Sequence, residues 1–135
     1  MVIQLSVAIR NAMANQIEGT IGPSAVLRIR SGAVPANVAA ADAGTVLASC
    51  NLPSDWLSAS SAGVVSQVGV WQDTSADATG TAAHFRIYAS NGTTTGMQGT
   101  VTATGGGGDM TVDNVSFTAG QQFTVTSFTY TRGNA

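Results

Sequence analysis

The amino-acid sequence predicts an all-β fold, an antiparallel β-sandwich of the jelly-roll type with one short N-terminal helix. Three observations lead to this prediction. Apolar and polar residues alternate along several short stretches, which is the period of a half-buried strand. Turn-forming residues separate these stretches, and threonine, a β-branched residue that favours strands, dominates the second half of the chain. An open sheet packed on the helix is the alternative arrangement of the same elements.

The helix is expected close to the N-terminus. Ser6 is a suitable N-cap, and Ile9, Met13 and Ile17 recur at the spacing of one helical face. Gly19 and Gly22, with a proline directly after the second glycine, end the pattern. A short amphipathic helix must bury its apolar face, so this face is expected to pack on the domain's own sheet or on a neighbouring subunit.

The clearest strand covers residues 82–89, where His84, Arg86 and Tyr88 form a polar face opposite an apolar one. The dipeptide Asn91–Gly92 follows it and is the strongest short-range signal for a hairpin. Further strands are expected at 25–30, 45–49, 64–71, 95–104, 110–112, 115–117 and 123–130.

The composition indicates a single domain over residues 1–135 with a weakly charged surface. Only 9% of residues are charged, against about 25% in ordinary soluble domains. The chain has no lysine, and Glu18 is its single glutamate. A surface of small polar residues loses little side-chain entropy and ionic hydration when a partner covers it, which favours a buried interface.

Several classes of function are not expected. The five arginines form no basic stripe for nucleic acid, and no apolar run approaches the roughly 20 residues that cross a membrane. The N-terminus carries no visible secretory signal. Cys50 is the single cysteine, so it forms no internal disulfide and is expected to be a buried structural thiol. These features suit a protein made and assembled in a reducing cytoplasm.

Residues that could carry chemistry are few. His84 is the single histidine and lacks a readable nucleophile or carboxylate partner, so we expect an exposed or interface histidine rather than a general base. The pairs Asp109–Asp113 and Asp73–Asp77 could hold Ca²⁺ or act as glycosidase carboxylates, but aspartate is also an ordinary turn residue.

Glycine and aromatic residues offer two weaker signals. The run Gly105–Gly108 has no following helix or lysine to form a phosphate-binding loop, so we interpret it as a flexible hairpin tip. A sugar-binding platform or an ordinary core could be built from Trp56, Trp71, Phe85 and Tyr88. We therefore expect no enzymatic activity, no catalytic, metal or cofactor-binding residues, and no cofactor.

Several stretches nevertheless carry a resemblance to known proteins, and together they span nearly the whole chain. These stretches are Ala25–Gly32, Leu52–Trp56, Thr79–Tyr88, Met97–Met110, Val125–Thr129 and Gly133–Ala135. They resemble a family of small virion proteins of tailed phages and prophages, and in particular the jelly-roll capsid cement proteins of a short-tailed Bordetella phage. No catalytic motif comes with this resemblance.

The resemblance implies a capsid cement, or decoration, protein on the outside of a phage head. Such a protein would form a homodimer or trimer and clamp neighbouring subunits of the major capsid protein, with no nucleic-acid or membrane partner. Residues 1–5 and 131–135 are the natural interaction arms, because a terminal segment can add to the sheet edge of a neighbour. The alternative is a tail or fibre component with a receptor- or carbohydrate-binding role.

Overall fold

The structure, a computed structural model, describes residues 3–134 and places one helix and ten strands in them. The mostly β fold with one short helix is therefore confirmed. The elements are α1 (Val7–Ile21), β1 (Val26–Arg30), β2 (Val46–Asn51), β3 (Val64–Ser66), β4 (Gln72–Asp73), β5 (Gly80–Thr81), β6 (His84–Tyr88), β7 (Thr95–Ala103), β8 (Met110–Val112), β9 (Ser116–Phe117) and β10 (Phe123–Thr131). The strand expected at 64–71 ends early at Ser66, and Gly69 beyond it has a positive φ of 77°.

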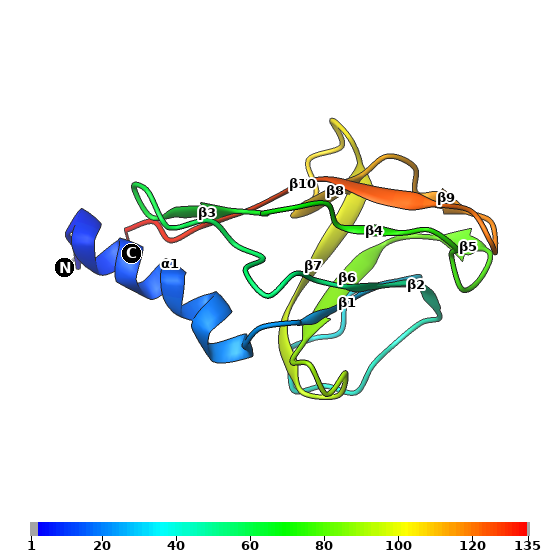
Figure 1. Ribbon diagram of the computed structural model, residues 1–135, viewed down its shortest axis with the longest axis horizontal. Helices are drawn as coiled ribbons and strands as arrows, with labels where there is room; N and C mark the ends of the chain where they lie inside the picture. Colours follow the sequence, from blue (N-terminus) through cyan, green and yellow to red (C-terminus); the bar gives the residue numbers. More distant parts are fainter. Residues whose placement is uncertain (1–2, 135) are drawn as a thin grey trace.

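One curled, mixed sheet forms a half-barrel around the core (Figure 1). Its strands follow the order β2-β1-β6-β7-β8-β10-β3, β4 pairs with β10, and β5 and β9 form a separate small sheet. The jelly-roll arrangement is not confirmed, because one curled sheet replaces the two packed sheets that we expected. The prediction that all strands pair antiparallel is wrong at one place, where β7 and β8 run parallel.

A glycine-rich turn makes the parallel pair of β7 and β8 feasible. Parallel strands ordinarily need a connection of about a dozen residues, but only residues 104–109 separate these two. Gly105 and Gly107 have positive φ angles of 87° and 80°. A Cβ atom on Gly106 would lie 2.7 Å from Thr102, so the turn packs tightly on β7. The hairpin expected at Gly105–Gly108 is wrong, because the strands that this turn joins run parallel.

Aromatic residues fill the concave side of the curled sheet. The rings of Trp56 and Trp71 lie 6.0 Å apart, and Trp71 is 5.5 Å from Phe128. Phe85 of β6 meets the edge of Phe128 at 5.7 Å, which joins the two halves of the sheet. Cys50 and the aliphatic residues of β1 and β2 complete this buried cluster.

The helix forms where the sequence predicts it. Ser6 caps its start, because the Ser6 hydroxyl accepts a hydrogen bond from the Ile9 amide at 3.3 Å. Gly22 ends it with a φ of 97°, and the Gly22 amide donates to the Glu18 carbonyl oxygen. No helix in residues 3–134 is long and apolar enough to cross a membrane.

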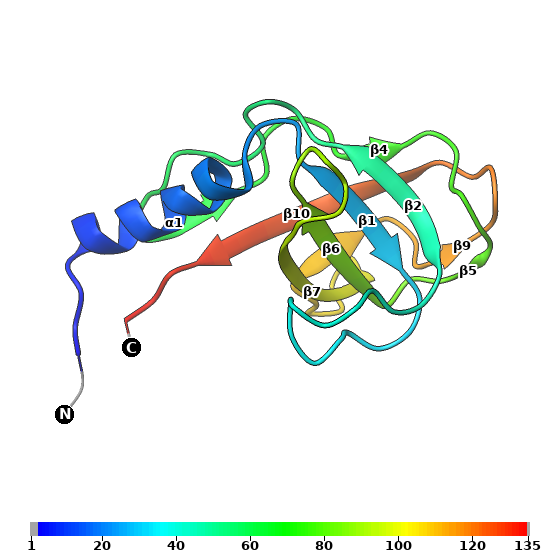
Figure 2. The same ribbon diagram turned by 90° about the horizontal axis from the view of Figure 1, so that it is seen from below.

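The molecule has two regions, which we call the body and the wing. The wing consists of α1, β3 and residues 129–134, and it projects from the curled sheet that forms the body (Figures 1 and 2). The first and last described residues lie at the far end of the wing (Figure 2), where the Leu5 amide donates to Oδ1 of Asn134 at 2.8 Å.

Candidate functional site

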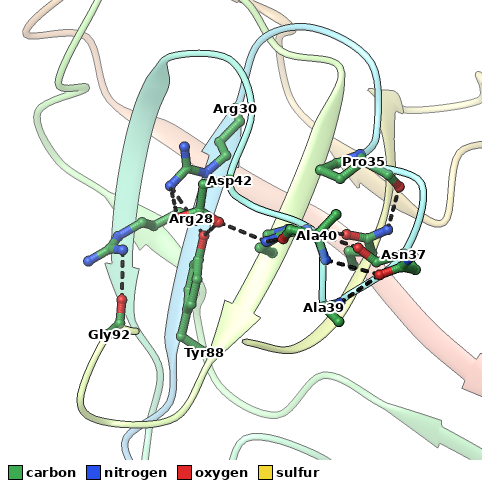
Figure 3. A network of polar contacts seen from close by, with 11 residues as sticks. Arg28, Arg30, Pro35, Asn37, Ala39, Ala40, Asp42, Tyr88 and Gly92 are labelled. Atoms are coloured by element: carbon green, nitrogen blue, oxygen red, sulfur yellow. Dashed lines mark hydrogen bonds and ion pairs between the residues drawn. The ribbon is translucent and has the colours of Figure 1, made fainter. Parts of the chain in front are cut away.

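A buried polar network covers the outer face of β6 (Figure 3). We expected His84 to be exposed or at an interface, on one polar face with Arg86 and Tyr88, but each of the three side chains is at most 1% exposed. This expectation is wrong because the alanine-rich connection between β1 and β2, residues 31–45, folds over that face and shields it from water. A strand with one apolar and one polar face is thus buried on both.

Arg86 is the centre of the network. Its Nε and Nη2 atoms both donate to Oε1 of Gln98, at 3.1 and 2.9 Å. Its Nη1 donates to the Ala40 carbonyl oxygen at 3.0 Å and to Oδ1 of Asp42 at 2.9 Å, and its Nη2 donates to the Asn37 carbonyl oxygen at 3.2 Å. A guanidinium group has five N–H donors, and these five contacts give each of them an acceptor in the protein.

Asp42 joins the connection to two strands at once. Its carboxylate forms ion pairs of 2.9 Å with both Arg30 and Arg86, and it accepts a 2.7 Å hydrogen bond from the Tyr88 hydroxyl. Partial burial opposes ionisation of Asp42, but the Tyr88 hydrogen bond and the two arginine charges outweigh it and lower the pKa of this carboxyl. Asp42 therefore remains ionised and holds the connection closed at neutral pH.

Tyr88 and His84 make further polar contacts on this face of β6. The Arg28 guanidinium lies 4.8 Å from the centre of the Tyr88 ring, and burial together with the bond to Asp42 raises the pKa of Tyr88. Nδ1 of His84 lies 2.8 Å from the Gly32 carbonyl oxygen, which can only accept, so Nδ1 carries the proton. Nε2 of His84 is buried and has no partner in the described residues.

The aspartates proposed as metal or glycosidase pairs instead cap main-chain groups. Oδ2 of Asp109 accepts from the amide and hydroxyl of Thr100, and Oδ1 of Asp113 accepts from the Thr124 amide at 3.1 Å. Within residues 3–134, no group of three or more histidine, cysteine, aspartate or glutamate side chains gathers as a metal site would require.

Asp73 and Asp77 meet at Ser49 of the edge strand β2. Oδ2 of Asp73 accepts from the Ser49 amide at 3.0 Å, and Oδ2 of Asp77 accepts from the Ser49 hydroxyl at 3.1 Å. The Asp77 amide also donates to the Leu47 carbonyl oxygen at 2.7 Å. These bonds occupy the free edge of β2, which would otherwise be open to pairing with another chain.

The aromatic and thiol candidates lie in the core. Trp56 and Trp71 are fully buried, so neither presents a ring to a sugar, and Phe85 and Tyr88 are at most 1% exposed. Cys50 is 4% exposed, and burial raises the pKa of its thiol, so it is a poor nucleophile.

Polar side chains attach α1 to the rest of the fold. The Glu18 carboxylate accepts hydrogen bonds from the amides of Trp56 and Leu57, at 3.1 and 2.9 Å. Oδ1 of Asn11 accepts from the Gly63 amide at 2.7 Å, and Oδ1 of Asn15 accepts from the Ser60 amide at 2.8 Å. The i, i+4, i+7 spacing of these three side chains is a helical stripe visible in the sequence, which we did not use.

Part of the apolar stripe of α1 is consequently left exposed. We expected this face to pack on the domain's own sheet or on a neighbouring subunit: Ile17 packs against the core, whereas Ile9 and Met13 are 49% and 43% exposed, and the fully buried residue of the helix is Ala14. Six large apolar side chains are exposed among residues 3–134, and four of them, Ile3, Val7, Ile9 and Met13, belong to the wing or the segment that leads into it. This concentration makes the wing the candidate interaction surface.

The C-terminal segment is more tightly held than we expected. Thr131 pairs with Val64 of β3, and the Arg132 amide donates to the Gly63 carbonyl oxygen. Of the arm expected at 131–135, only Gly133 and Asn134 therefore follow the paired segment, and Ala135 lies outside the described residues. Met1 and Val2 of the N-terminal arm also lie outside them, whereas Ile3 to Leu5 belong to no helix or strand.

The comparisons with known proteins yield no relative. No protein-family model, curated protein or solved structure matches this chain.

Proposed function

We propose that this chain is a structural virion protein, a capsid cement or decoration protein that binds the outside of a phage head. It would clamp neighbouring subunits of the major capsid protein and act as a homodimer or homotrimer. The observation that carries this proposal is the exposed apolar stripe of the wing, which extends into the N-terminal segment. A projecting apolar unit on an otherwise weakly charged protein is the kind of surface that another protein covers.

The use of charge supports the same proposal. Arg30, Arg86 and Asp42 bind one another inside the body, and Glu18 binds main-chain amides beneath the helix. The charged residues thus hold the fold together, and few of them remain to surround a partner-binding surface with hydration that would have to be removed. Weak contacts made by many copies on one shell would then add up through multivalency.

The direct test is the copy number of the protein in purified particles of a phage that encodes it. A cement protein would appear on a calibrated gel in a fixed ratio to the major capsid protein, and electron microscopy would show it on the head. A few copies per particle, located on the tail, would instead support the alternative of a tail or fibre component. Absence from the particle would reject both structural roles.

The terminal arms can be tested separately on heads that lack the protein. Deleting residues 1–5 leaves the Ser6 cap and α1 in place, so lost head binding would reflect the arm itself. Deleting 131–135 also removes the pair between Thr131 and Val64, so removal of residues 133–135 is the matched variant that spares β10. Unchanged head occupancy by both truncated proteins would reject the arms.

A further inference from the structure

Three arginines of the body lie on one face of the sheet, and a single carboxylate pairs with them. Arg28 and Arg30 belong to β1, and Arg86 of β6 lies directly opposite Arg28, so the three side chains leave the sheet on the same side. Arg30 and Arg86 both pair with Asp42, and no other ion pair forms in the described residues. This covered face therefore carries an excess of positive charge.

Asp42 uses only part of the binding capacity of Arg30. Figure 3 shows Arg30 and Tyr88 meeting at Asp42, where Nη2 of Arg30 donates to the carboxylate at 2.9 Å and to the Tyr88 hydroxyl at 3.2 Å. Nε of Arg30 is buried and has no acceptor in the described residues, although Arg30 is only 6% exposed. An arginine and a carboxylate form their strongest contact through two parallel N–H···O bonds. A carboxylate that can orient itself freely would thus bind Arg30 through both Nε and Nη2.

The loop that covers this face, residues 32–44, has little apolar attachment to the body. None of its side chains belongs to the buried core or packs against it. Side chains of the body bind its main-chain oxygens instead: Gln98 donates to the Pro35 carbonyl oxygen at 2.8 Å, and Arg86 and His84 make similar contacts. A segment with few buried apolar contacts opens locally at a low cost in free energy.

The two ends of this covering loop have the features of a hinge. The Ser31 amide donates to the Thr45 carbonyl oxygen at 3.1 Å, and the Thr45 amide donates to the Ser31 hydroxyl at 3.0 Å, so the ends are held side by side. Gly32 and Gly44 lie just inside these bonds with positive φ angles of 80° and 70°. A loop with joined ends and a glycine at each end can swing as one piece while β1 and β2 keep their places.

We propose that the face formed by Arg30, Arg86 and Tyr88 is a carboxylate-binding site, that Asp42 occupies it as an internal ligand, and that the covering loop is a lid that opens to admit the carboxylate of another molecule. Clusters of arginine recognise acidic segments in this way. Because Asp42 competes with any external ligand, the closed lid is autoinhibitory. This inference goes beyond the proposed function and does not depend on it.

Acetate tests the site once its internal ligand is removed. Asp42→Ala leaves Arg30 and Arg86 without a carboxylate, so acetate at neutral pH should raise the midpoint of thermal unfolding of this variant by about 3 °C or more and then saturate. Sodium chloride at the same ionic strength should not have this effect. The wild type and Asp55→Ala, which removes an aspartate without an ion pair in the described residues, should respond equally to the two salts. An equal response of Asp42→Ala to both salts would overturn the site. If Asp42→Ala is partly unfolded, circular dichroism follows the same titration, because acetate should restore the folded signal.

Two arginine variants show whether acetate binds where Asp42 binds. In the Asp42→Ala background, Arg30→Met should abolish most of the rise caused by acetate, because it removes the Nε and Nη2 donors. Arg28→Met is the matched control, since Arg28 lies on the same face but donates to the Gly92 carbonyl oxygen and not to Asp42. The rise should persist in that variant. An equal loss in both variants would contradict the proposed site.

A capped peptide with the sequence of residues 39–44 tests the lid and the source of the carboxylate. This peptide carries the aspartate of the covering loop on a separate chain. Asp42→Ala should bind it about tenfold or more tightly than the wild type, because the variant has no internal competitor. At saturation, nuclear magnetic resonance of the wild type should show shift changes for the amides of residues 32–44. Binding by Asp42→Ala without any binding by the wild type would overturn the lid. Tighter binding of the peptide than of acetate would identify a protein segment as the ligand, and the reverse would identify a free organic acid.

Discussion

The body and the wing place their polar and apolar residues in opposite ways. In the body, the polar face of β6 is buried beneath the connection of residues 31–45 and bound by an arginine–aspartate–tyrosine network. In the wing, the polar stripe of α1 faces inward, and the apolar side chains Ile9 and Met13 are exposed. Both regions therefore depend on polar contacts inside the fold, but most of the large exposed apolar side chains lie in the wing or in the segment that leads into it.

This difference indicates which region is complete by itself. The body pairs its buried arginines Arg30 and Arg86 with Asp42 and packs its aromatic rings into one core. The wing is attached by apolar side chains such as Ala14 and Val65 and by hydrogen bonds from α1, which contribute only about 1 kcal/mol each on balance. A region held in this way and exposing a row of large apolar side chains gains most from association.

The largest effect is expected when the network of the body is broken. Arg86→Met keeps much of the side-chain volume but leaves the acceptor oxygens of Asn37, Ala40 and Gln98 without their donor. It also removes one of the two arginine charges that pair with Asp42. We expect a loss of about 3 kcal/mol in the free energy of unfolding. Urea denaturation measures this loss.

A matched arginine gives the control for this prediction. Arg28 is partly exposed, donates to the Gly92 carbonyl oxygen and lies over the Tyr88 ring. Arg28→Met should therefore cost about 1 kcal/mol. Equal losses in the free energy of unfolding for Arg86→Met and Arg28→Met would contradict this prediction, because the buried arginine would then stabilise the fold no more than the partly exposed one.

The second prediction separates the wing from the body. Glu18→Ala leaves the Trp56 and Leu57 amides without their acceptor, and we expect it to cost about 1–3 kcal/mol. The loss should be local, so deuterium exchange should accelerate in α1 while β6 stays protected. Glu18→Gln retains an acceptor oxygen and should have a smaller effect. Unchanged exchange in α1 after Glu18→Ala would mean that other contacts hold the wing.

The local features of both regions could be predicted from the sequence. The N-cap Ser6, the hairpin at Asn91–Gly92 and the alternation that defines β6 act over a few neighbouring residues, so one sequence displays them directly. The strands expected at 110–112 and 123–130 also correspond closely to β8 and β10. These are the elements for which local propensity and the final fold agree.

The remaining features depend on contacts between distant segments. Alternation shows that β6 has a polar face, but it does not show whether water or residues 31–45 will cover that face. Asp42 looked like an ordinary loop residue because its partners Arg30 and Tyr88 are 12 and 46 residues away. The apolar stripe of α1 suggested an inward face, although the competing stripe with Glu18 makes the stronger contacts with the fold.

The smallest predicted effect concerns the pH dependence of the body. The pKa of Asp42 is lower in the folded protein than its ordinary value of 3.8, so ionised Asp42 stabilises the fold above about pH 4. This stabilisation is lost as the pH falls through the folded pKa. Because 40% of the Asp42 side chain is exposed, solvent screening limits the effect to about 1 kcal/mol or less.

Comparison of the wild type with Asp42→Asn in urea denaturation between pH 7 and pH 3 isolates this contribution. The wild type should be more stable at pH 7, and the difference should shrink below about pH 4, because protonation removes the charge that the substitution also removes. Asp55→Asn is the control, since it removes an aspartate charge that forms no ion pair within residues 3–134. If the difference in stability between the wild type and Asp42→Asn stays constant from pH 7 to pH 3, the connection of residues 31–45 is held by its hydrogen bonds to Arg86 and not by the charge of Asp42. The body would then be as independent of ion pairs as the wing.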